Sequence, residues 1–293
     1  MHDNGNETGN NSGQIAADSA SSRPQALWQA TVLTLFPEMF PGPLGHSLAG
    51  KSLNDGIWAL KTLDIREFAR DKHRTVDDAP LGGGVGMVLK PDVAAAALAA
   101  AAPCPGPRIY LSPRGRLLDQ PLVRELAATP GAVFLCGRYE GIDQRVLDFY
   151  KFDEYSLGDY ILAGGEVAAQ TVIEAAVRLL PGTLGDKESL KDESFSQDLL
   201  EFPQYTRPRT WKNLKIPEEL QSGNHKLISE WRMKNSLKLT QKIRPDLFED
   251  FISHFLSSEI FIFIPKQIFS FKSIFKNLIN SCTYQIRCFV HIK

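Results

Sequence analysis

The stretch Phe134-Leu-Cys-Gly-Arg-Tyr-Glu-Gly141, followed after a short spacer by Ser156-Leu-Gly-Asp-Tyr-Ile-Leu-Ala-Gly-Gly-Glu166, decides the fold. Each part is a short apolar run that ends in glycines and leads into a helix-like pattern. Glycine lets the backbone approach a ligand and adopt turns that other residues resist. Two such loops at neighbouring strand ends predict a pocket lined by main-chain N–H and C=O groups. Neither loop matches the dinucleotide fingerprint or the phosphate loop, which disfavours a nicotinamide dehydrogenase.

Outward from this stretch, strand-like and helix-like segments alternate. Apolar and β-branched runs predict strands at 28–36, 57–63, 108–111, 132–136 and 154–157, and helical patterns lie at 44–53, from Pro91 onward, and at 118–128, 142–150 and 166–180. This alternation predicts an α/β domain with a mainly parallel sheet. Ligands of such sheets bind outside the carboxyl ends of the strands, where the loops 112–115, 137–141 and 158–165 are expected.

Composition shifts divide the chain further. Residues 1–26 are rich in Asn, Gly and Ser and are expected to be a disordered extension, and 27–184 hold the α/β domain. We expect a polar linker at 185–200 and a helical domain at 201–252, with Leu214, Leu227 and Leu237 among its core residues. Residues 253–293 are an atypical tail of unknown role, rich in Phe, Ile, Lys and Ser.

Charge and cysteine usage narrow the class of protein. The net charge is −1, yet residues 207–244 hold ten basic and three acidic residues, a local charge of +7. Such a segment favours an anionic partner, or is an ordinary solvated face. The four cysteines lack metal-ligand spacing, and Cys136 in its strand is expected to be a buried reduced thiol, which fits a cytoplasmic location. No apolar run reaches the ~18 residues of a membrane span, and no signal peptide is expected.

A polar, glycine-rich loop follows the second expected strand. It contains His73, Arg74, Asp77 and Asp78 and the three glycines Gly82, Gly83 and Gly84. Loops of this composition often bind ligands, although a flexible connector is the alternative. His73 has no second metal ligand at helical spacing, so no metal site is predicted.

Taken together, these motifs closely resemble the bacterial tRNA (guanine-N1)-methyltransferase family, TrmD. The resemblance runs in order from Trp28 to Phe251. Besides the segments quoted above, it includes Leu35-Phe-Pro-Glu-Met-Phe40, Tyr110-Leu-Ser-Pro113, Ser194-Phe195, Tyr205-Thr-Arg-Pro208, Ser222-Gly-Asn-His225, Trp231-Arg232 and Arg244-Pro-Asp-Leu247.

The resemblance implies an S-adenosyl-L-methionine-dependent enzyme of the SPOUT class. Its fold would be α/β with a deep trefoil knot, and it would work as a homodimer. The family methylates N1 of the guanine at tRNA position 37, next to the anticodon, which helps to hold the reading frame. Magnesium supports turnover in many members, and the sequence shows no dedicated metal site.

Motif matching assigns sixteen residues to the cofactor pocket in the knot. They are Tyr110, Leu111, Ser112, Pro113, Gly137, Tyr139, Glu140, Gly141, Ile142, Ser156, Leu157, Gly158, Tyr160, Leu162, Gly164 and Gly165. Glycine-punctuated loops supply the backbone partners and apolar faces that adenine needs. The alternative is that these glycines serve turn geometry alone.

The family's chemistry suggests the catalytic groups. N1 of guanine carries a proton at neutral pH, which a carboxylate can take as general base. The family places an acid, usually Asp, just before Ser-Phe, and here that residue is Glu193, preceded by Asp192, so either can be the base. The matching arginine, Arg178, would stabilise negative charge on O6, or would simply complement the helix dipole.

Substrate contacts are also implied by the resemblance. His73, Arg74, Asp77, Asp78 and the glycines 82–84 are candidates for holding guanine, and Arg207, His225, Arg232 and Arg244 are candidates for the tRNA backbone. Each could instead form an interdomain pair. The family shares each site between two subunits and orders the linker when tRNA binds. A tRNA-binding module without activity, and a methyltransferase of another RNA, are the rival functions.

Overall fold

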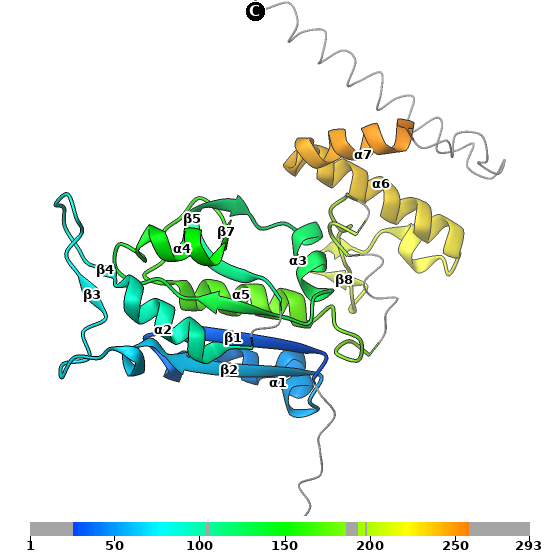
Figure 1. Ribbon diagram of the computed structural model, residues 1–293. Helices are drawn as coiled ribbons and strands as arrows, with labels where there is room; N and C mark the ends of the chain where they lie inside the picture. The colour runs from blue at the N-terminus through cyan, green and yellow to red at the C-terminus, as the bar shows by residue number, and fades with distance from the viewer. Residues whose placement is uncertain (1–25, 104–105, 186–192, 197, 258–293) are drawn as a thin grey trace, which may run out of the picture. The chain divides into compact units, whose positions relative to one another are not determined.

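The computed structural model of the protein describes residues 26–103, 106–185, 193–196 and 198–257 (Figure 1). The expected extension before residue 26 and the tail beyond residue 257 lie outside the described residues. The chain divides after Gly185 into two compact units, which we call the first and second unit.

The first unit is built on a five-stranded sheet in which every neighbouring pair of strands is parallel. Its order is β2 (Trp58–Asp64), β1 (Trp28–Thr34), β6 (Gly131–Leu135), β5 (Arg108–Leu117) and β7 (Asp153–Ser156). The predicted α/β class with a mainly parallel sheet is therefore confirmed.

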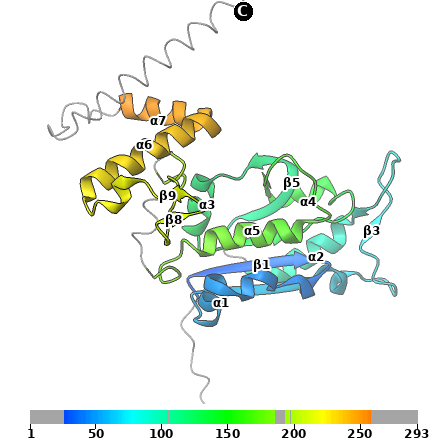
Figure 2. The same cartoon turned by 180° about the vertical axis from the view of Figure 1, so that it is seen from behind.

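Helices cover both faces of this sheet, as Figures 1 and 2 allow the reader to follow. One apolar cluster joins the sheet to α1 (Ser47–Asn54), α3 (Gln120–Ala127) and α5 (Gly165–Val177). The second cluster joins the other face to α2 (Pro91–Ala101) and α4 (Gln144–Tyr150). Strands that are buried on both faces read as continuous apolar runs, as β6 does.

The side chains of β1 alternate between the two apolar clusters. Trp28 and Val32 pack into the first cluster, whereas Leu33 packs into the second, because successive side chains of a strand point to opposite faces. Two buried indoles also satisfy their N–H groups: Trp28 Nε1 donates to the Leu126 carbonyl at 3.2 Å and Trp58 Nε1 to the Ala49 carbonyl at 2.9 Å. These bonds tie α3 and α1 to the sheet.

Loops differ from the sequence-based expectation in one place. The turn predicted at 112–115 lies inside β5, which continues to Leu117. Leu111 and Arg116 both pair with Tyr155, so the residues between them bulge out of the ladder.

The polar loop between β2 and α2 contains a small ladder of β3 (Asp77–Asp78) with β4 (Val88–Leu89). Short 3₁₀ turns lie at Pro37–Met39, Gly42–Gly45 and Ile65–Phe68.

The second unit combines two helices with a hairpin. Its helices are α6 (His225–Ile243) and α7 (Pro245–Ser257), and its hairpin pairs β8 (Thr210–Trp211) with β9 (Leu214–Lys215), followed by a 3₁₀ turn at Glu218–Gln221. The helical expectation is therefore wrong for 210–215, where the two-residue turn favours a hairpin instead.

A small core holds the second unit together. Leu199, Leu237 and Phe248 are buried in it. Of the predicted core residues, Leu237 is correct, but Leu214 and Leu227 are 68% and 43% exposed. Residues 199–200, which we expected in a linker, pack on α6, where Leu200 N–H donates to Thr240 Oγ1 at 2.8 Å.

Candidate functional site

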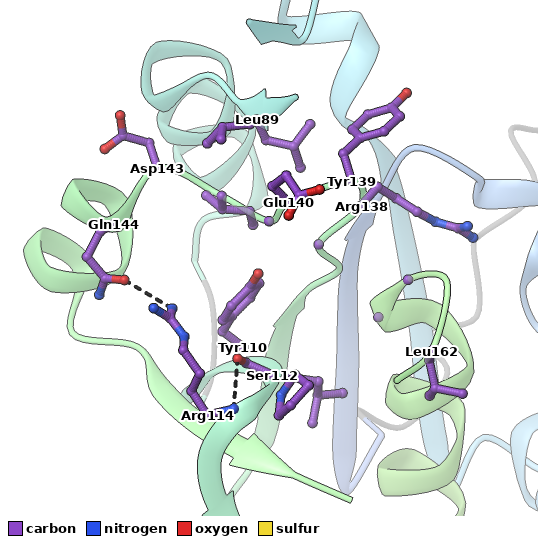
Figure 3. Close-up of a pocket in the computed structure, with 18 of the residues that line it drawn as sticks. Leu89, Tyr110, Ser112, Arg114, Arg138, Tyr139, Glu140, Asp143, Gln144 and Leu162 are labelled. Atoms are coloured by element: carbon purple, nitrogen blue, oxygen red, sulfur yellow. Dashed lines mark hydrogen bonds between the residues drawn. The ribbon is translucent and has the colours of Figure 1, made fainter. Parts of the chain in front are cut away.

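A pocket of about 970 Å³ opens among the loop that bulges out of β5 between Leu111 and Arg116 and the loops that follow β6 and β7 (Figure 3). All sixteen residues that the sequence assigned to a cofactor pocket line it. The volume lies at the upper end of the range typical of pockets for ligands the size of a cofactor. The fold therefore brings together at one sheet edge three loops that are well separated in the sequence.

Main-chain atoms form the floor of the pocket, because Gly137 and Gly165 lie too close to neighbouring atoms to carry a side chain. Gly165 N–H donates to the Gly137 carbonyl at 3.0 Å, which joins the two glycine loops. A Cβ atom on Gly137 would lie 2.7 Å from the Tyr110 hydroxyl, and one on Gly165 would lie 3.0 Å from Cys136 Cα. Gly141 has a φ of +108°, which favours glycine for conformational reasons as well. Close approach and turn geometry therefore both require glycine here.

Tyr110 is the principal polar side chain in the wall. Burial raises the pKa of its phenol above the ordinary value, so the hydroxyl stays protonated at neutral pH. It lies against the Gly137 loop, as the short distance to a Cβ on that glycine shows. Burial likewise raises the pKa of the neighbouring Cys136 thiol well above the ordinary value, which agrees with the expected buried reduced thiol.

Beneath the glycine loops lies a buried ion pair that the sequence did not predict. Arg138 Nε lies 2.9 Å from Glu166 Oε2, and Thr34 Oγ1 donates to Glu166 Oε1 at 2.7 Å. The Arg138 guanidinium also covers the Phe36 ring at 4.4 Å. The 2.9 Å contact lacks hydrogen-bond geometry, so we attribute it to Coulomb attraction. Glu166 is 1% exposed, and its pairing with β1 was not visible in sequence because Thr34 lies far away along the chain.

Polar side chains surround the pocket mouth. Arg114 donates to Gln144 Oε1 at 3.2 Å and lies 3.5 Å from Glu154 Oε2, and Figure 3 shows it beside Ser112, whose Oγ accepts from the Arg114 N–H. Asp143, also on the rim, pairs with Arg145 at 2.7 Å. The hydrogen bond from Arg145 holds the pKa of Asp143 below its ordinary value, so the rim carries fixed charges.

The polar loop 71–87 is anchored at its end next to the pocket. Leu89 N–H donates to the Gly141 carbonyl and Glu140 N–H to the Met87 carbonyl, both at 2.9 Å. Asp78 and the following residues 79–81 line the pocket.

The other candidates of this loop do not line the pocket; these are His73, Arg74, Asp77, Gly82, Gly83 and Gly84. The Asp71 carboxylate holds the backbone around His73: it accepts from the His73 N–H at 2.8 Å and from the Thr75 N–H at 3.0 Å. Gly82 and Gly83 have φ angles of +97° and +84° and open space around them, so their conformation alone favours glycine.

Of the expected catalytic residues, only Arg178 belongs to the first unit, and it is not among the residues that line this pocket. Arg178 is the C-cap of α5, whose first residue, Gly165, lines the pocket. Ala168 is the last residue of α5 that lines the pocket, and a rise of 1.5 Å per residue places Arg178 roughly 15 Å further along the helix, so Arg178 is not part of the pocket wall. Glu193 belongs to the second unit, where its carbonyl accepts from Ser196 Oγ at 2.6 Å. Asp192 lies outside the described residues.

The basic candidates of the second unit have different surroundings. Arg207 is exposed, and His225 begins α6 after the N-cap Asn224. Arg232 lies 4.8 Å over the Phe202 ring. Arg244 pairs with Asp246 at 2.6 Å, and the hydrogen bond from Arg244 lowers the pKa of Asp246, so this arginine already has a local partner.

Two further classes of site are absent from the described ranges. No group of three or more His, Cys, Asp or Glu side chains there is arranged to hold a metal ion. No helix in the same ranges has both the length and the apolar character to cross a membrane.

Comparison with known proteins gives a consistent picture. A sequence profile described as "tRNA (Guanine-1)-methyltransferase TrmD" matches residues 28–250. A relative from Rhodospirillum rubrum is 59% identical over 225 residues, covering 77% of this chain and 94% of the relative. Relatives from Rhodopseudomonas palustris and Ruegeria pomeroyi are 59% and 54% identical, over 75% and 76% of this chain and 88% and 93% of their own lengths. All three are named tRNA (guanine-N(1)-)-methyltransferase.

Proposed function

The chain belongs to the TrmD family of tRNA (guanine-1)-methyltransferases, and on this premise we propose that it methylates N1 of the guanine at position 37 of tRNA. The methyl donor would be S-adenosyl-L-methionine. The single observation that carries the proposal is the pocket in which all sixteen residues matched to the family's cofactor motifs meet.

The residues of the pocket fit this donor. Gly137, Gly141 and Gly165 form a cradle that any side chain would narrow, and Tyr110 presents a phenol that stays protonated. Main-chain groups and apolar walls of this kind hold a flat purine. When bound, the donor supplies a methyl group already activated by a sulfonium centre.

The protein's own task is then to prepare the acceptor nitrogen. We assign Glu193 as the general base that removes the proton from guanine N1, with Asp192 as the alternative. Arg178 would stabilise the negative charge that grows on O6 as that proton leaves. His73, Arg74, Asp77, Asp78 and Gly82–Gly84 would hold the guanine and its neighbours, and fixing the reacting groups in line would supply much of the remaining acceleration.

We propose that the enzyme is a homodimer with shared active sites. The position of Arg178 supports this: it lies roughly 15 Å along α5 beyond Ala168, the last residue of the helix that lines the pocket, where it would serve the pocket of a partner copy. An apolar patch at the pocket edge and the start of α5 supports it too: Tyr160, Ile161, Leu162 and Val167 are 54%, 81%, 41% and 49% exposed. Contiguous exposed apolar side chains favour burial against a partner.

We propose that the chain shares further properties of the family. A trefoil knot fits the bond from Gly165 to Gly137 and the bridge between Arg138 and Gly164, which join loops 158–165 and 137–141. Arg207, His225, Arg232 and Arg244 would contact the tRNA backbone. Magnesium would assist turnover, and the enzyme would work in the cytoplasm with its tRNA.

Methyl transfer from labelled S-adenosylmethionine tests the function. The substrates are two tRNA transcripts that differ only in guanine or adenine at position 37, and Glu193→Gln is compared with the parent chain. We expect transfer to the guanine transcript alone, reduced at least ~100-fold by the substitution, as for loss of a general base. Binding of tRNA without transfer by the parent chain would instead support the binding-module reading.

A further inference from the structure

The hairpin of the second unit exposes a tryptophan. Trp211 and Leu214 are directly paired across β8 and β9, so their side chains share one face, and they are 59% and 68% exposed. The turn residues Lys212 and Asn213 have φ angles of +48° and +65°, the left-handed pair of a tight two-residue hairpin turn. The backbone thus holds the indole at a rigid tip.

The charged residues of the segment that carries this tip are all basic. Residues 203–217 contain Arg207, Arg209, Lys212 and Lys215 and no acidic residue, and 203–215 are all exposed. Lys212 Nζ lies 4.8 Å from the Trp211 ring. The tip therefore offers an aromatic face together with four cations, and its charge complements an anion.

The base of the hairpin is held by local contacts within the second unit. Ile216 N–H donates to the Arg209 carbonyl at 3.1 Å, and Gln221 Nε2 donates to the Ile216 carbonyl at 2.9 Å. Just before the hairpin, Tyr205 meets Trp231 edge to face at 5.9 Å. These contacts fix the hairpin where it leaves the unit and leave Trp211 at its outer end.

An exposed indole among cations is the arrangement with which proteins bind unpaired nucleotides. Bases stack on aromatic rings while Lys and Arg neutralise the flanking phosphates. We propose that Trp211 stacks on an unpaired base of the anticodon loop, and that Arg209, Lys212 and Lys215 neutralise neighbouring phosphates. This deepens the proposed function, on which its choice of tRNA rests. A protein partner at the same tip is the alternative that the experiment must separate.

Substitution of the indole is the first test. Trp211→Ala, Trp211→Phe and Leu214→Ala are compared for dissociation of a fluorescent tRNA transcript and for KM and kcat. Loss of one stacked base should raise the tRNA Kd and KM by about 5- to 150-fold in Trp211→Ala. Trp211→Phe should keep most of the affinity, and Leu214→Ala should change it less than threefold. Circular dichroism and denaturant unfolding should be the same in all four proteins, which shows that the second unit of each is folded, and the affinity for S-adenosylmethionine should be equal as well.

A matching change on the RNA identifies the contact. Transcripts are made with an abasic site at one anticodon-loop position at a time, excluding position 37. At the stacked position, the parent chain and Trp211→Ala should bind equally tightly, whereas at every other position the parent chain should keep its advantage. Intrinsic fluorescence gives a second readout: Trp28 and Trp58 are buried and Trp231 is partly buried, so the quenching by tRNA that the parent chain shows and Trp211→Phe lacks reports Trp211.

Several results would overturn the proposal. Unchanged tRNA affinity in Trp211→Ala would do so, as would an equal loss with every abasic transcript. Equal losses in Trp211→Ala and Leu214→Ala, together with a lower oligomeric state in sedimentation, would assign the tip to a protein partner. These binding results do not depend on methyl transfer. A parent chain that binds tRNA through Trp211 without methylating it would therefore refute the proposed activity and keep this inference.

Discussion

At the scale of single residues, the most consequential feature is the network of Glu166, Arg138 and Thr34. It links the start of α5, the first glycine loop and the end of β1, so one carboxylate fixes three separate segments under the pocket. Removing one member of a buried pair leaves the other charge without compensation.

We therefore expect Glu166→Gln to lower the free energy of unfolding by about 3 kcal/mol, because Arg138 loses its buried counter-charge. The amide can still accept from Thr34, so the loss reports the ion pair. Denaturant unfolding measures it, and the affinity for S-adenosylmethionine should fall in parallel. The comparison Thr34→Val removes two hydrogen bonds, the one to Glu166 Oε1 and the one accepted from the Phe36 N–H, and should cost about 2 kcal/mol. A smaller cost for Glu166→Gln than for Thr34→Val would show that the ion pair contributes little to stability.

The contact between Gly137 and Tyr110 gives a second prediction. Gly137→Ala places a methyl group 2.7 Å from the Tyr110 hydroxyl, so we expect about 1–3 kcal/mol of destabilisation and weaker donor binding. Tyr110→Phe removes the nearest atom, so the added methyl should cost less in that background. Calorimetric titration of all four proteins measures the coupling. Gly185→Ala, at a glycine with open space around it, is the matched control and should be neutral. Additive effects would argue against the contact.

At the scale of elements, the sequence predicted the first unit far better than the second. Strands β1, β2, β6 and β7 and helices α2 to α5 lie within a few residues of their predicted positions, because long apolar runs and helical periods mark them. The hairpin of 210–215 was missed because each strand has only two residues, too few to show alternation. Its exposed Leu214 looked like a core residue for the same reason.

The candidate functional site was likewise predicted from the sequence only in part. Glycines next to strands indicated the pocket, because backbone approach is encoded locally. The pairing of Glu166 with Thr34 and Arg138 depends on the assembled sheet, whereas the helical pattern of 166–180 already indicated that Arg178 lies near the end of α5. No local pattern in the sequence reports such contacts.

Helix α6 supplies a prediction at this scale. The Asn224 side chain accepts from the N–H groups of Lys226 and Leu227 at 3.0 and 3.3 Å, which caps the helix. Asn224→Ala should lower the free energy of unfolding by about 1 kcal/mol, whereas Asn224→Asp should retain the cap. Chemical denaturation followed by the fluorescence of Trp231, which lies in α6, measures the change. A loss of the same size with Asp would contradict the capping role.

At the scale of the whole molecule, the two units carry different chemistry. The first holds a compact pocket with backbone walls, and the second holds the basic hairpin. Affinity for a polyanion depends on released counterions, whereas affinity for a small ligand in a backbone cradle does not.

Salt should therefore separate the two binding events. If the four cations of residues 207–215 each neutralise one phosphate, they alone should make tRNA affinity fall roughly 50- to 150-fold between 50 and 200 mM salt. The affinity for S-adenosylmethionine should change little over that range. Titrations at four salt concentrations give both slopes, and replacing Lys212 and Lys215 by Gln should reduce the tRNA slope by nearly two. If the two affinities depended equally on salt, the assignment of tRNA binding to the basic hairpin and of donor binding to the backbone-walled pocket would be contradicted.

The backbone walls of the pocket have a consequence for inhibition. A competitor that binds the main chain around Gly137, Gly141 and Gly165 contacts groups that no point substitution can remove. Any side chain added at Gly137 or Gly165 would also crowd Tyr110 or the Cys136 backbone, on which the enzyme itself depends. Resistance would then have few routes through the pocket. Surviving mutants would be expected to raise expression or to exclude the drug from the cell instead.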